Sequence, residues 1–482
     1  MSPLASPPVT QLSAAVIGLD VLSSTRASAE AIAARQQQRL AQLLAAAAKG
    51  TRFYRDTLRG QDPAHIPLQA LPVMAKRGLM ADLPAHVSDP AITLAGLRAF
   101  CADASRIGQP FLDRYWVWES SGSTGQPGVF VQDAAAMAVY DALEASRRHS
   151  PRPWARLLDP FYLSERFALV GAIDGHFASI VCSQRLRGGN PWLAGHSRNF
   201  SILQPVAALV QQLQDFAPGI LATYPSAALL LAEQARRGAL RLRLQEVWTG
   251  GETLTPAARL IIEQGLGCPL RNSYGASEFL PIAWECGHGR LHVNADWVIL
   301  EPVDAQHRPV PAGTLSHTTL LTNLANHLQP LIRFDIGDRI ALGGLACACG
   351  SALPVVQVEG RTDDVLMLPG ADGAPVMLLP LALSTVLEDE AGVFDFQLQA
   401  LGPRHWRLTL GGEADRSPAA RARCRTLLAD FVRRQGALAP RIEVRGAEAI
   451  APGRSGKRQR IVAAAGPQRQ AKLAAALTSP PV

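Results

Sequence analysis

Residues 118–127 read WESSGSTGQP, so small and hydroxyl-bearing residues lie side by side directly after an aromatic run. The apolar residues 129–131 that follow suit a β-strand, which would place the stretch in a turn between strands. Clusters of Ser, Gly and Thr are typical both of flexible linkers and of loops that wrap a phosphate chain with backbone N–H groups and hydroxyls. The lysine-containing loop GxxxxGK(S/T) occurs nowhere in the chain. On its own the stretch is best interpreted as a linker, and the other motifs have to decide.

Composition indicates a globular protein of more than one domain. The chain has 482 residues, more than one hydrophobic core usually serves, with 48% hydrophobic and 18% charged residues. Its 47 basic and 40 acidic residues give a net charge of +7, which suits anionic small ligands as well as nucleic acid. The densest basic run, at 454–460, contains no aromatic residue. We therefore expect no nucleic-acid partner.

The sequence gives no sign of a membrane or secretion segment. No apolar run reaches the roughly 18 residues that a membrane helix needs, and the first residues lack the basic region of a signal peptide. We expect a soluble, cytoplasmic protein that does not bind a membrane. Seven cysteines in so long a chain, without a secretion signal, argue against a disulfide framework. Clustered cysteines then indicate a metal.

The residue pattern changes near residue 361. Helix-forming residues at 28–49 are followed, from about 167, by alternating strands and helices, which predicts a mostly parallel sheet covered by helices. Beyond 361, helices and strands alternate differently and predict a small α+β domain, with elements at about 379–390, 394–399, 405–410, 418–435 and 441–445. The tail after about 464 is expected to be disordered. We expect an α/β fold with domains at 1–361 and 362–482.

Further motifs follow residues 118–127 in order: TGGETL at 249–254, NSYGASE at 272–278, RFDIGD at 333–338 and EGRTDD at 359–364. In order and spacing they resemble the signatures of the adenylate-forming superfamily of acyl-CoA synthetases, adenylation domains and luciferases, and specifically its phenylacetate-CoA ligase branch. The resemblance extends from about residue 30 to residue 463. It implies a large N-terminal adenylate-forming domain with mixed and parallel sheets, and a small, mobile C-terminal α+β domain.

The resemblance also implies an ATP site. The phosphate loop would hold the β- and γ-phosphates, although Gln126 stands where most relatives carry Lys. Glu252 would lie along the adenine with Tyr274 near it, and Asp338 would accept both ribose hydroxyls. The implied nucleotide-binding residues are Ser120, Ser121, Gly122, Ser123, Thr124, Gly125, Gly251, Glu252, Ser273, Tyr274, Gly275, Ser277 and Asp338.

Three catalytic residues and a hinge follow from the same resemblance. Glu278 would ligate Mg²⁺, which prefers a carboxylate together with phosphate oxygens. Arg361 would contact the phosphates, and Asp363 would be the hinge about which the small domain rotates. Lys457 would reach into the site for the first half-reaction, where its ammonium stabilises the developing negative charge. As ordinary surface residues, these groups would be solvated charges or ion-pair partners.

Clustered cysteines give an independent signal. Cys286 precedes two candidate ligands, His288 and His292, and two more thiols follow at Cys347 and Cys349. Three thiols and one imidazole form a closed tetrahedral zinc site, which is structural because no position remains for an activated water. The Cys-x5-His spacing of related ligase-like proteins selects Cys286, His292, Cys347 and Cys349 as a zinc subsite at about 286–349. Reduced surface cysteines are the alternative.

The acid-binding residues are less defined. Relatives line the acyl pocket after a strand at the position of His176 and Phe177, and Tyr224 is a further candidate. A buried packing role is an equally good explanation for these side chains. Their apolar and aromatic character suits an aromatic or other apolar acid.

The resulting hypothesis is ATP-dependent activation of a carboxylic acid to an acyl-adenylate, followed by transfer to a thiol, for which the resemblance suggests coenzyme A. A carrier-protein phosphopantetheine or an amine is an alternative acceptor. A protein of a different class, a non-catalytic zinc-stabilised nucleotide-binding homologue, is the second hypothesis. The cofactors expected are ATP, Mg²⁺ and structural Zn²⁺, and a homodimer is possible.

Overall fold

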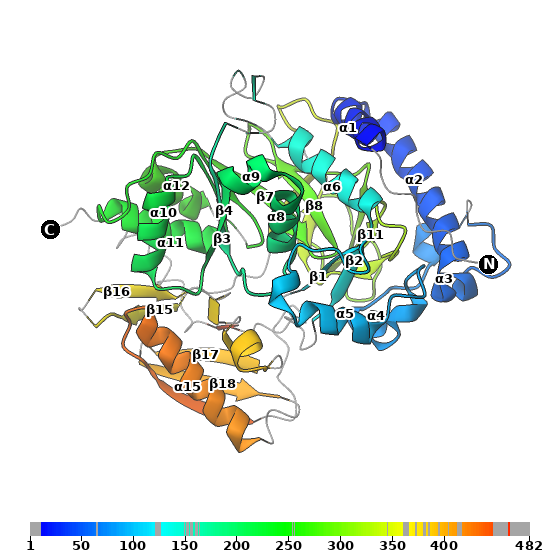
Figure 1. Cartoon of the computed structure of the whole chain (residues 1–482). Helices are drawn as coiled ribbons and strands as arrows, with labels where there is room; N and C mark the ends of the chain where they lie inside the picture. Colours follow the sequence, from blue (N-terminus) through cyan, green and yellow to red (C-terminus); the bar gives the residue numbers. More distant parts are fainter. Residues whose placement is uncertain are drawn as a thin grey trace.

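The computed structural model describes residues 11–63, 66–120, 127–148, 150, 154, 158–159, 162, 164–252, 254, 256–344, 346–359, 366–371, 374–378, 382–383, 386–393, 396–402, 404–411, 417–446 and 461–462. Over these residues the chain is an α/β protein, as predicted (Figure 1). No helix in these ranges has both the length and the apolar character needed to cross a bilayer.

The chain begins with helices. They are α1 (Gln11–Thr25), α2 (Ala29–Gly50), α3 (Arg52–Thr57), α4 (Lys76–Ala81) and α5 (Leu94–Cys101). Helix α2 matches the helix predicted at 28–49, because the Ser28 hydroxyl accepts the N–H of Ala31 and caps the first turn. Its buried face includes Leu43 and Leu44.

A nine-stranded sheet forms the centre of the molecule, in the order β13-β14-β9-β8-β7-β6-β5-β3-β4. Five neighbouring strands are parallel: β3 (Phe167–Gly171), β4 (Ser197–Ser201), β5 (Ile220–Thr223), β6 (Glu246–Thr249) and β7 (Leu270–Ala276). The rest pair antiparallel: β8 (Phe279–Glu285), β9 (Leu291–Val293), β13 (Arg339–Leu342) and β14 (Val355–Glu359). The mostly parallel prediction therefore holds for β3 to β7, and the other half makes the sheet mixed.

Helices connect the parallel strands and cover the sheet (Figure 1). They are α8 (Ala178–Gly189), α9 (Pro191–His196), α10 (Val206–Phe216), α11 (Pro225–Arg236) and α12 (Pro256–Leu266). Helix α10 illustrates how such a helix packs. Its apolar residues recur at helical spacing, and the buried ones are Leu209, Val210, Leu213 and Phe216. It ends at Ala217, which is in the left-handed region with φ 48°.

Shorter elements lie beside the central sheet. The strands β1 (Trp116–Glu119) and β2 (Val129–Gln132) form an antiparallel pair, and α6 (Ala134–Arg147) follows them. A separate three-stranded sheet consists of β10 (Val298–Val303), β11 (Thr318–Asn323) and β12 (Phe334–Asp335).

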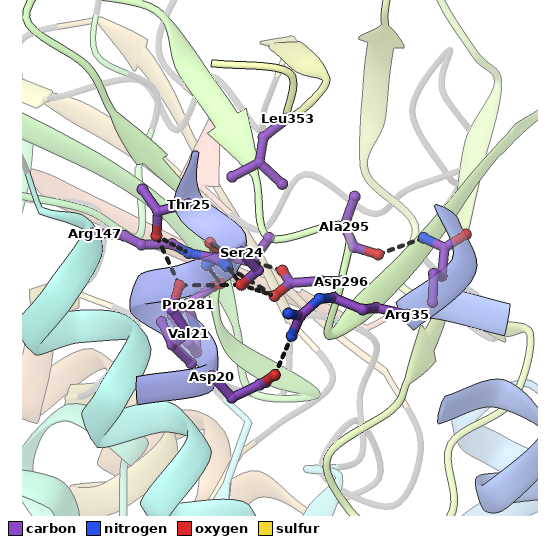
Figure 2. Close-up of polar contacts among 12 residues, drawn as sticks. Asp20, Val21, Ser24, Thr25, Arg35, Arg147, Pro281, Ala295, Asp296 and Leu353 are labelled. Carbon is purple, nitrogen blue, oxygen red and sulfur yellow. Dashed lines mark hydrogen bonds and ion pairs between the residues drawn. The ribbon is translucent and has the colours of Figure 1, made fainter. Parts of the chain in front are cut away.

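A buried ion pair joins α1 to the rest of this part (Figure 2). Arg147, the last residue of α6, donates to both carboxylate oxygens of Asp296 at 2.7 Å, and both side chains have no exposed surface. The Ser24 hydroxyl of α1 donates to the same carboxylate at 2.8 Å. Burial favours a higher pKa for Asp296, but the hydrogen bonds from Arg147 and Ser24 and the nearby Arg39 bring the pKa below its usual value. The carboxylate is therefore ionised and holds α1 in place.

The residues after 365 form a smaller sheet and helix. The strands β17 (Phe396–Gly402), β18 (His405–Leu410), β19 (Arg441–Gly446) and β20 (Ile461–Val462) pack against α15 (Pro418–Arg434), and β15 (Leu366–Pro369) pairs with β16 (Pro375–Leu378). The element predicted at about 418–435 is α15, which Ser417 caps and Gly436 follows with φ 82°. Of the helix predicted at 379–390, the described residues are helical: Ala382 and Leu383, and a π-helical turn at Val386–Glu390.

Candidate active site

One open cavity of about 3170 Å³ brings together residues of four of the five sequence motifs. Its wall includes Ser120 at the end of β1, the residues after β6, and the turn between β7 and β8. The residues before β13 complete it, although they lie far away in the sequence. The parallel strands β6 and β7 end at this edge, which is where ligands bind in open α/β sheets.

The Tyr274 hydroxyl donates to a carboxylate oxygen of Asp338 at 2.9 Å. Tyr274 lies on β7 and Asp338 directly precedes β13, so two residues predicted for adenine and ribose meet across 64 positions of sequence. The Thr319 hydroxyl donates to the backbone carbonyl of Asp338 at 2.7 Å and fixes its position further. An oriented carboxylate beside an aromatic ring can accept the two hydroxyls of a ribose.

Glycines bring the backbone close to this wall. A side chain at Gly250 would place a Cβ 2.7 Å from the Ser273 hydroxyl oxygen, and Gly251 has φ 81° with the Tyr224 ring beside it. At Gly275 a Cβ would lie 2.0 Å from the backbone carbonyl oxygen of Leu280. Glycine at these positions therefore lets the TGGE and SYGA stretches pack closely against Ser273, the Tyr224 ring and the Leu280 carbonyl.

Glu278 lies in the turn between β7 and β8, lines the cavity and is 7% exposed. The backbone on both sides of the turn is held by side chains from other elements. The Trp118 indole donates to the Ser277 carbonyl at 2.8 Å, and the Asn323 amide donates to the Glu278 carbonyl at 2.9 Å. A nearly buried carboxylate on a fixed backbone is suited to a hard divalent cation.

Only the first residue of the predicted phosphate loop belongs to the described residues. The Ser120 N–H donates to the Gly128 carbonyl at 2.8 Å, and the Gly128 N–H donates to the Ser120 hydroxyl at 2.9 Å. Residues 121–126 therefore connect two antiparallel strands. The remaining predicted residues Ser121, Gly122, Ser123, Thr124, Gly125, Gln126, Arg361, Asp363 and Lys457 lie outside the described ranges.

The predicted acid-binding residues occupy different places. Phe177 and Tyr224 line the cavity, and so does Glu252. His176 is 1% exposed and packs with its ring centroid 5.2 Å from that of Phe100. Its carbonyl accepts the N–H of Glu119 at 2.7 Å, so the described contacts of His176 are with the scaffold rather than with the cavity.

The predicted metal ligands form one cluster. The ligand atoms of Cys286, His292, Cys347 and Cys349 all lie within 4.8 Å of one another. The Cys286 and Cys347 sulfurs are 3.7 Å apart, and the Cys349 sulfur is 3.3 Å from Nε2 of His292. The other nitrogen of His292, Nδ1, is 2.8 Å from the Leu353 carbonyl, which fixes it as the N–H donor and leaves Nε2 free to ligate. The donor set therefore fits a tetrahedral thiophilic ion, and its imidazole is His292 rather than His288.

The sequence did not predict the residues that hydrogen-bond to the backbone of the site motifs. Asn323, Gln329 and Glu285 are buried, and all three hydrogen-bond to backbone beside the motifs. A sequence signal did exist for the amides, because Asn323, Asn326 and Gln329 recur every three residues within the mainly apolar stretch 320–332. Their partners are distant in sequence and could not be named from it.

Comparison with known proteins agrees with this arrangement. The chain is 32% identical over 184 residues to the phenylacetate-coenzyme A ligase of Thermus thermophilus, a match covering 36% of this chain and 41% of that protein. It is 29% identical over 182 residues to the phenylacetate-coenzyme A ligase of Pseudomonas putida, covering 35% and 40%. The matches thus span about two fifths of the length of these relatives. No protein-family model matches the chain.

Solved structures extend the likeness to nearly the whole chain. A 2-hydroxyisobutyryl-CoA ligase in complex with 2-HIB-AMP and CoA, in its thioesterification state, has a TM-score of 0.58 and 21% identity over 93% of both chains. The same ligase in its postadenylation state has a TM-score of 0.53 and 21% identity over 94% of this chain and 93% of that one. The chain therefore has the fold of the adenylate-forming CoA ligases, and its curated sequence relatives include phenylacetate-coenzyme A ligases.

Proposed function

We propose that this protein is an AMP-forming acid–thiol ligase that activates a carboxylic acid with ATP and transfers the acyl group to coenzyme A. The hydrogen bond between Tyr274 and Asp338 carries the proposal, because it joins the expected adenine and ribose positions at one wall of the cavity. The similarity to phenylacetate-coenzyme A ligases and the shared fold with a CoA ligase support the same activity.

The proposed reaction has two steps. First, a carboxylate oxygen attacks the α-phosphorus of ATP, and pyrophosphate leaves with the electrons of the broken P–O bond. The sulfur of the thiol then attacks the acyl carbon, AMP leaves with the electrons of the broken C–O bond, and the thiol proton passes to solvent. Activation comes first because AMP is a far better leaving group than a carboxylate oxygen.

The described residues would bind and orient ATP. The Asp338 carboxylate would accept the ribose hydroxyls while Tyr274 fixes its orientation. Gly251 and Glu252, which line the cavity, would lie along the adenine, as the resemblance implies. Glu278 would hold the Mg²⁺ of MgATP, which supplies charge compensation at the phosphates when bound.

Other assignments rest on the resemblance. Residues 120–125 would contact the β- and γ-phosphates, Arg361 would contact the phosphates and Lys457 would serve the first step. Residues 362–482 would then turn about Asp363 relative to residues 1–361 between the two steps. An aromatic or other apolar acid is proposed, since Phe177 and Tyr224 line the cavity.

We further propose that Cys286, His292, Cys347 and Cys349 hold one structural Zn²⁺. All four positions of a tetrahedral ion would be filled by protein, so this metal would support the sheet and take no part in the reaction. Cys286 directly follows β8, His292 lies within β9, and Cys347 and Cys349 lie in the β13–β14 connection; β13 begins directly after Asp338. The ion would therefore brace the strands beside the ribose position.

The direct test is ATP–pyrophosphate exchange with a panel of aryl, fatty and amino acids. We expect exchange with at least one acid, and thioester formation when coenzyme A is added to that acid. Lys457→Ala should depress exchange far more than thioester formation from supplied acyl-adenylate. No exchange with any acid would instead favour a nucleotide-binding protein without catalysis, and thioester formation only on a carrier protein would change the acceptor.

A further inference from the structure

A network of buried amides lies behind the β7–β8 turn that carries Glu278. Asn323, Asn326, Gln329 and Gln132 have no exposed surface. Neutral amides in a core are stable only when their hydrogen bonds are made, and an apolar side chain would fill the same space at lower cost. The hydrogen-bond partners of these amides therefore show which segments of the chain they hold in place.

Asn323 ends β11 and directs its amide at the turn. Its Nδ2 donates to the Glu278 carbonyl at 2.9 Å and to the Tyr140 hydroxyl at 2.8 Å. Its Oδ1 accepts the N–H of Ala325 at 3.0 Å, which fixes the amide's orientation. Both hydrogens of the amide group are thus used, and one of them holds the backbone of Glu278.

The turn is held on its other side by Trp118. This indole is fully buried and donates to the Ser277 carbonyl at 2.8 Å, so consecutive carbonyls at 277 and 278 each accept a side-chain hydrogen bond. Trp118 also belongs to β1, which leads directly into the loop at 120–127. The strand β1 therefore contacts the turn that carries Glu278 and ends just before Ser120, the first of the predicted phosphate-binding residues.

The other amides hold the strand on the far side of that loop. Gln329 accepts the N–H of Val131 at 2.8 Å and donates to the Val129 carbonyl at 3.2 Å, so one side chain pairs with β2 as a neighbouring strand would. Asn326 donates to the Val131 carbonyl at 2.8 Å. The network thus connects the strand leaving the loop with the turn that carries Glu278.

We propose, resting on the function proposed above, that Asn323 is a positioning residue for the Mg²⁺ of MgATP. By holding the Glu278 carbonyl it fixes the backbone from which that residue's side chain extends toward the metal, without touching the metal or the nucleotide itself. Outer groups of this kind commonly change metal affinity by 10- to 100-fold when removed.

The test measures metal binding directly and does not depend on turnover. Mn²⁺ is titrated into the full-length protein with a non-hydrolysable ATP analogue and followed by electron paramagnetic resonance, for wild type, Asn323→Leu, Trp118→Phe and Tyr140→Phe. Asn323→Leu and Trp118→Phe should each weaken Mn²⁺ binding by roughly tenfold. Tyr140→Phe is the matched control, because it removes the other partner of the Asn323 amide and leaves the bond to Glu278; its Mn²⁺ affinity should equal that of wild type.

Two results would overturn the proposal. One is wild-type Mn²⁺ affinity in folded Asn323→Leu. The other is a loss of Mn²⁺ affinity in Tyr140→Phe as large as that in Asn323→Leu, which would indicate a general disturbance of core packing. If Asn323→Leu fails to fold, Trp118→Phe decides in the same way. Because the measurement needs no turnover, an absence of pyrophosphate exchange would contradict the ligase proposal alone. Unchanged Mn²⁺ binding in Glu278→Gln would refute the metal role on which the inference rests.

Discussion

Replacing Arg147 by Met tests how the N-terminal helix is held. The substitution keeps most of the side-chain volume and removes the guanidinium that donates two hydrogen bonds of 2.7 Å to Asp296. The same guanidinium donates to Asn294 at 2.8 Å, to Ser24 at 2.7 Å and to Thr25 at 3.2 Å, so four polar partners are affected. The buried Asp296 carboxylate would then keep only some of the hydrogen bonds and positive charge that stabilise it (Figure 2).

The expected loss is large. Removing one member of a buried ion pair typically costs about 3 to 5 kcal/mol, because the other charge stays buried. Asp296 would still accept from Ser24 at 2.8 Å and have Arg39 at 3.4 Å, which places the expectation at about 3 kcal/mol, the lower end of that range. The double substitution Arg147→Met with Asp296→Leu removes both charges and should recover at least half of this loss.

The loss should also depend on pH. The folded-state pKa of Asp296 is lowered, so its contribution to stability is present above the unfolded-state pKa of about 4 and is lost as pH falls through the folded value. In Arg147→Met the main cause of the lowering is gone and burial raises the pKa instead. The gap between wild type and variant should therefore be widest at pH 7 and narrow below pH 4.

Urea unfolding followed by tryptophan fluorescence at pH 7 and at pH 3.5 measures both effects. Arg59→Met is the matched control, since Arg59 pairs with Asp56 on the surface at 80% and 58% exposure and should cost under about 1 kcal/mol. A variant within 1 kcal/mol of wild type at pH 7, or a gap that does not change with pH, would refute this account of the buried pair.

Three further perturbations test the site. Tyr274→Phe removes the hydrogen bond to Asp338 and should raise KM for ATP about fivefold, from about 1 kcal/mol, with a smaller change in kcat; an unchanged KM would remove Tyr274 from ribose positioning. Glu278→Gln should abolish most pyrophosphate exchange at saturating Mg²⁺ while the thermal midpoint stays close to that of wild type; full exchange would exclude Glu278 as the metal ligand. Wild type should contain one zinc per chain by elemental analysis, and Cys347→Ser should lose it together with several degrees of Tm; wild-type protein without zinc would contradict the structural site.

Sequence reasoning succeeded where local patterns carry the information. The helix-forming residues at 28–49 and the element expected at about 418–435 match the helices α2 and α15. Each of these signals is contained within one helix, so no distant partner is needed to interpret it.

The prediction was less complete where partners are distant. The Cys-x5-His spacing of related proteins favoured His292 over the competing His288, and the geometry agrees because β9 pairs with β14 beside the connection that carries Cys347 and Cys349. The three-stranded sheet of β10 to β12 was not predicted. Nor was the buried pair of Arg147 and Asp296, because a charge whose partner is 149 residues away looks like any surface charge in the sequence.

Isotope transfer tests the central claim most directly. The acid that gives the best exchange is labelled with ¹⁸O in both carboxylate oxygens and converted to its thioester with ATP and coenzyme A, and the AMP is analysed by mass spectrometry. Attack of the carboxylate on the α-phosphorus predicts one ¹⁸O atom in AMP for each thioester formed. Label in inorganic phosphate with release of ADP, or AMP without label, would contradict an acyl-adenylate and with it the proposed function.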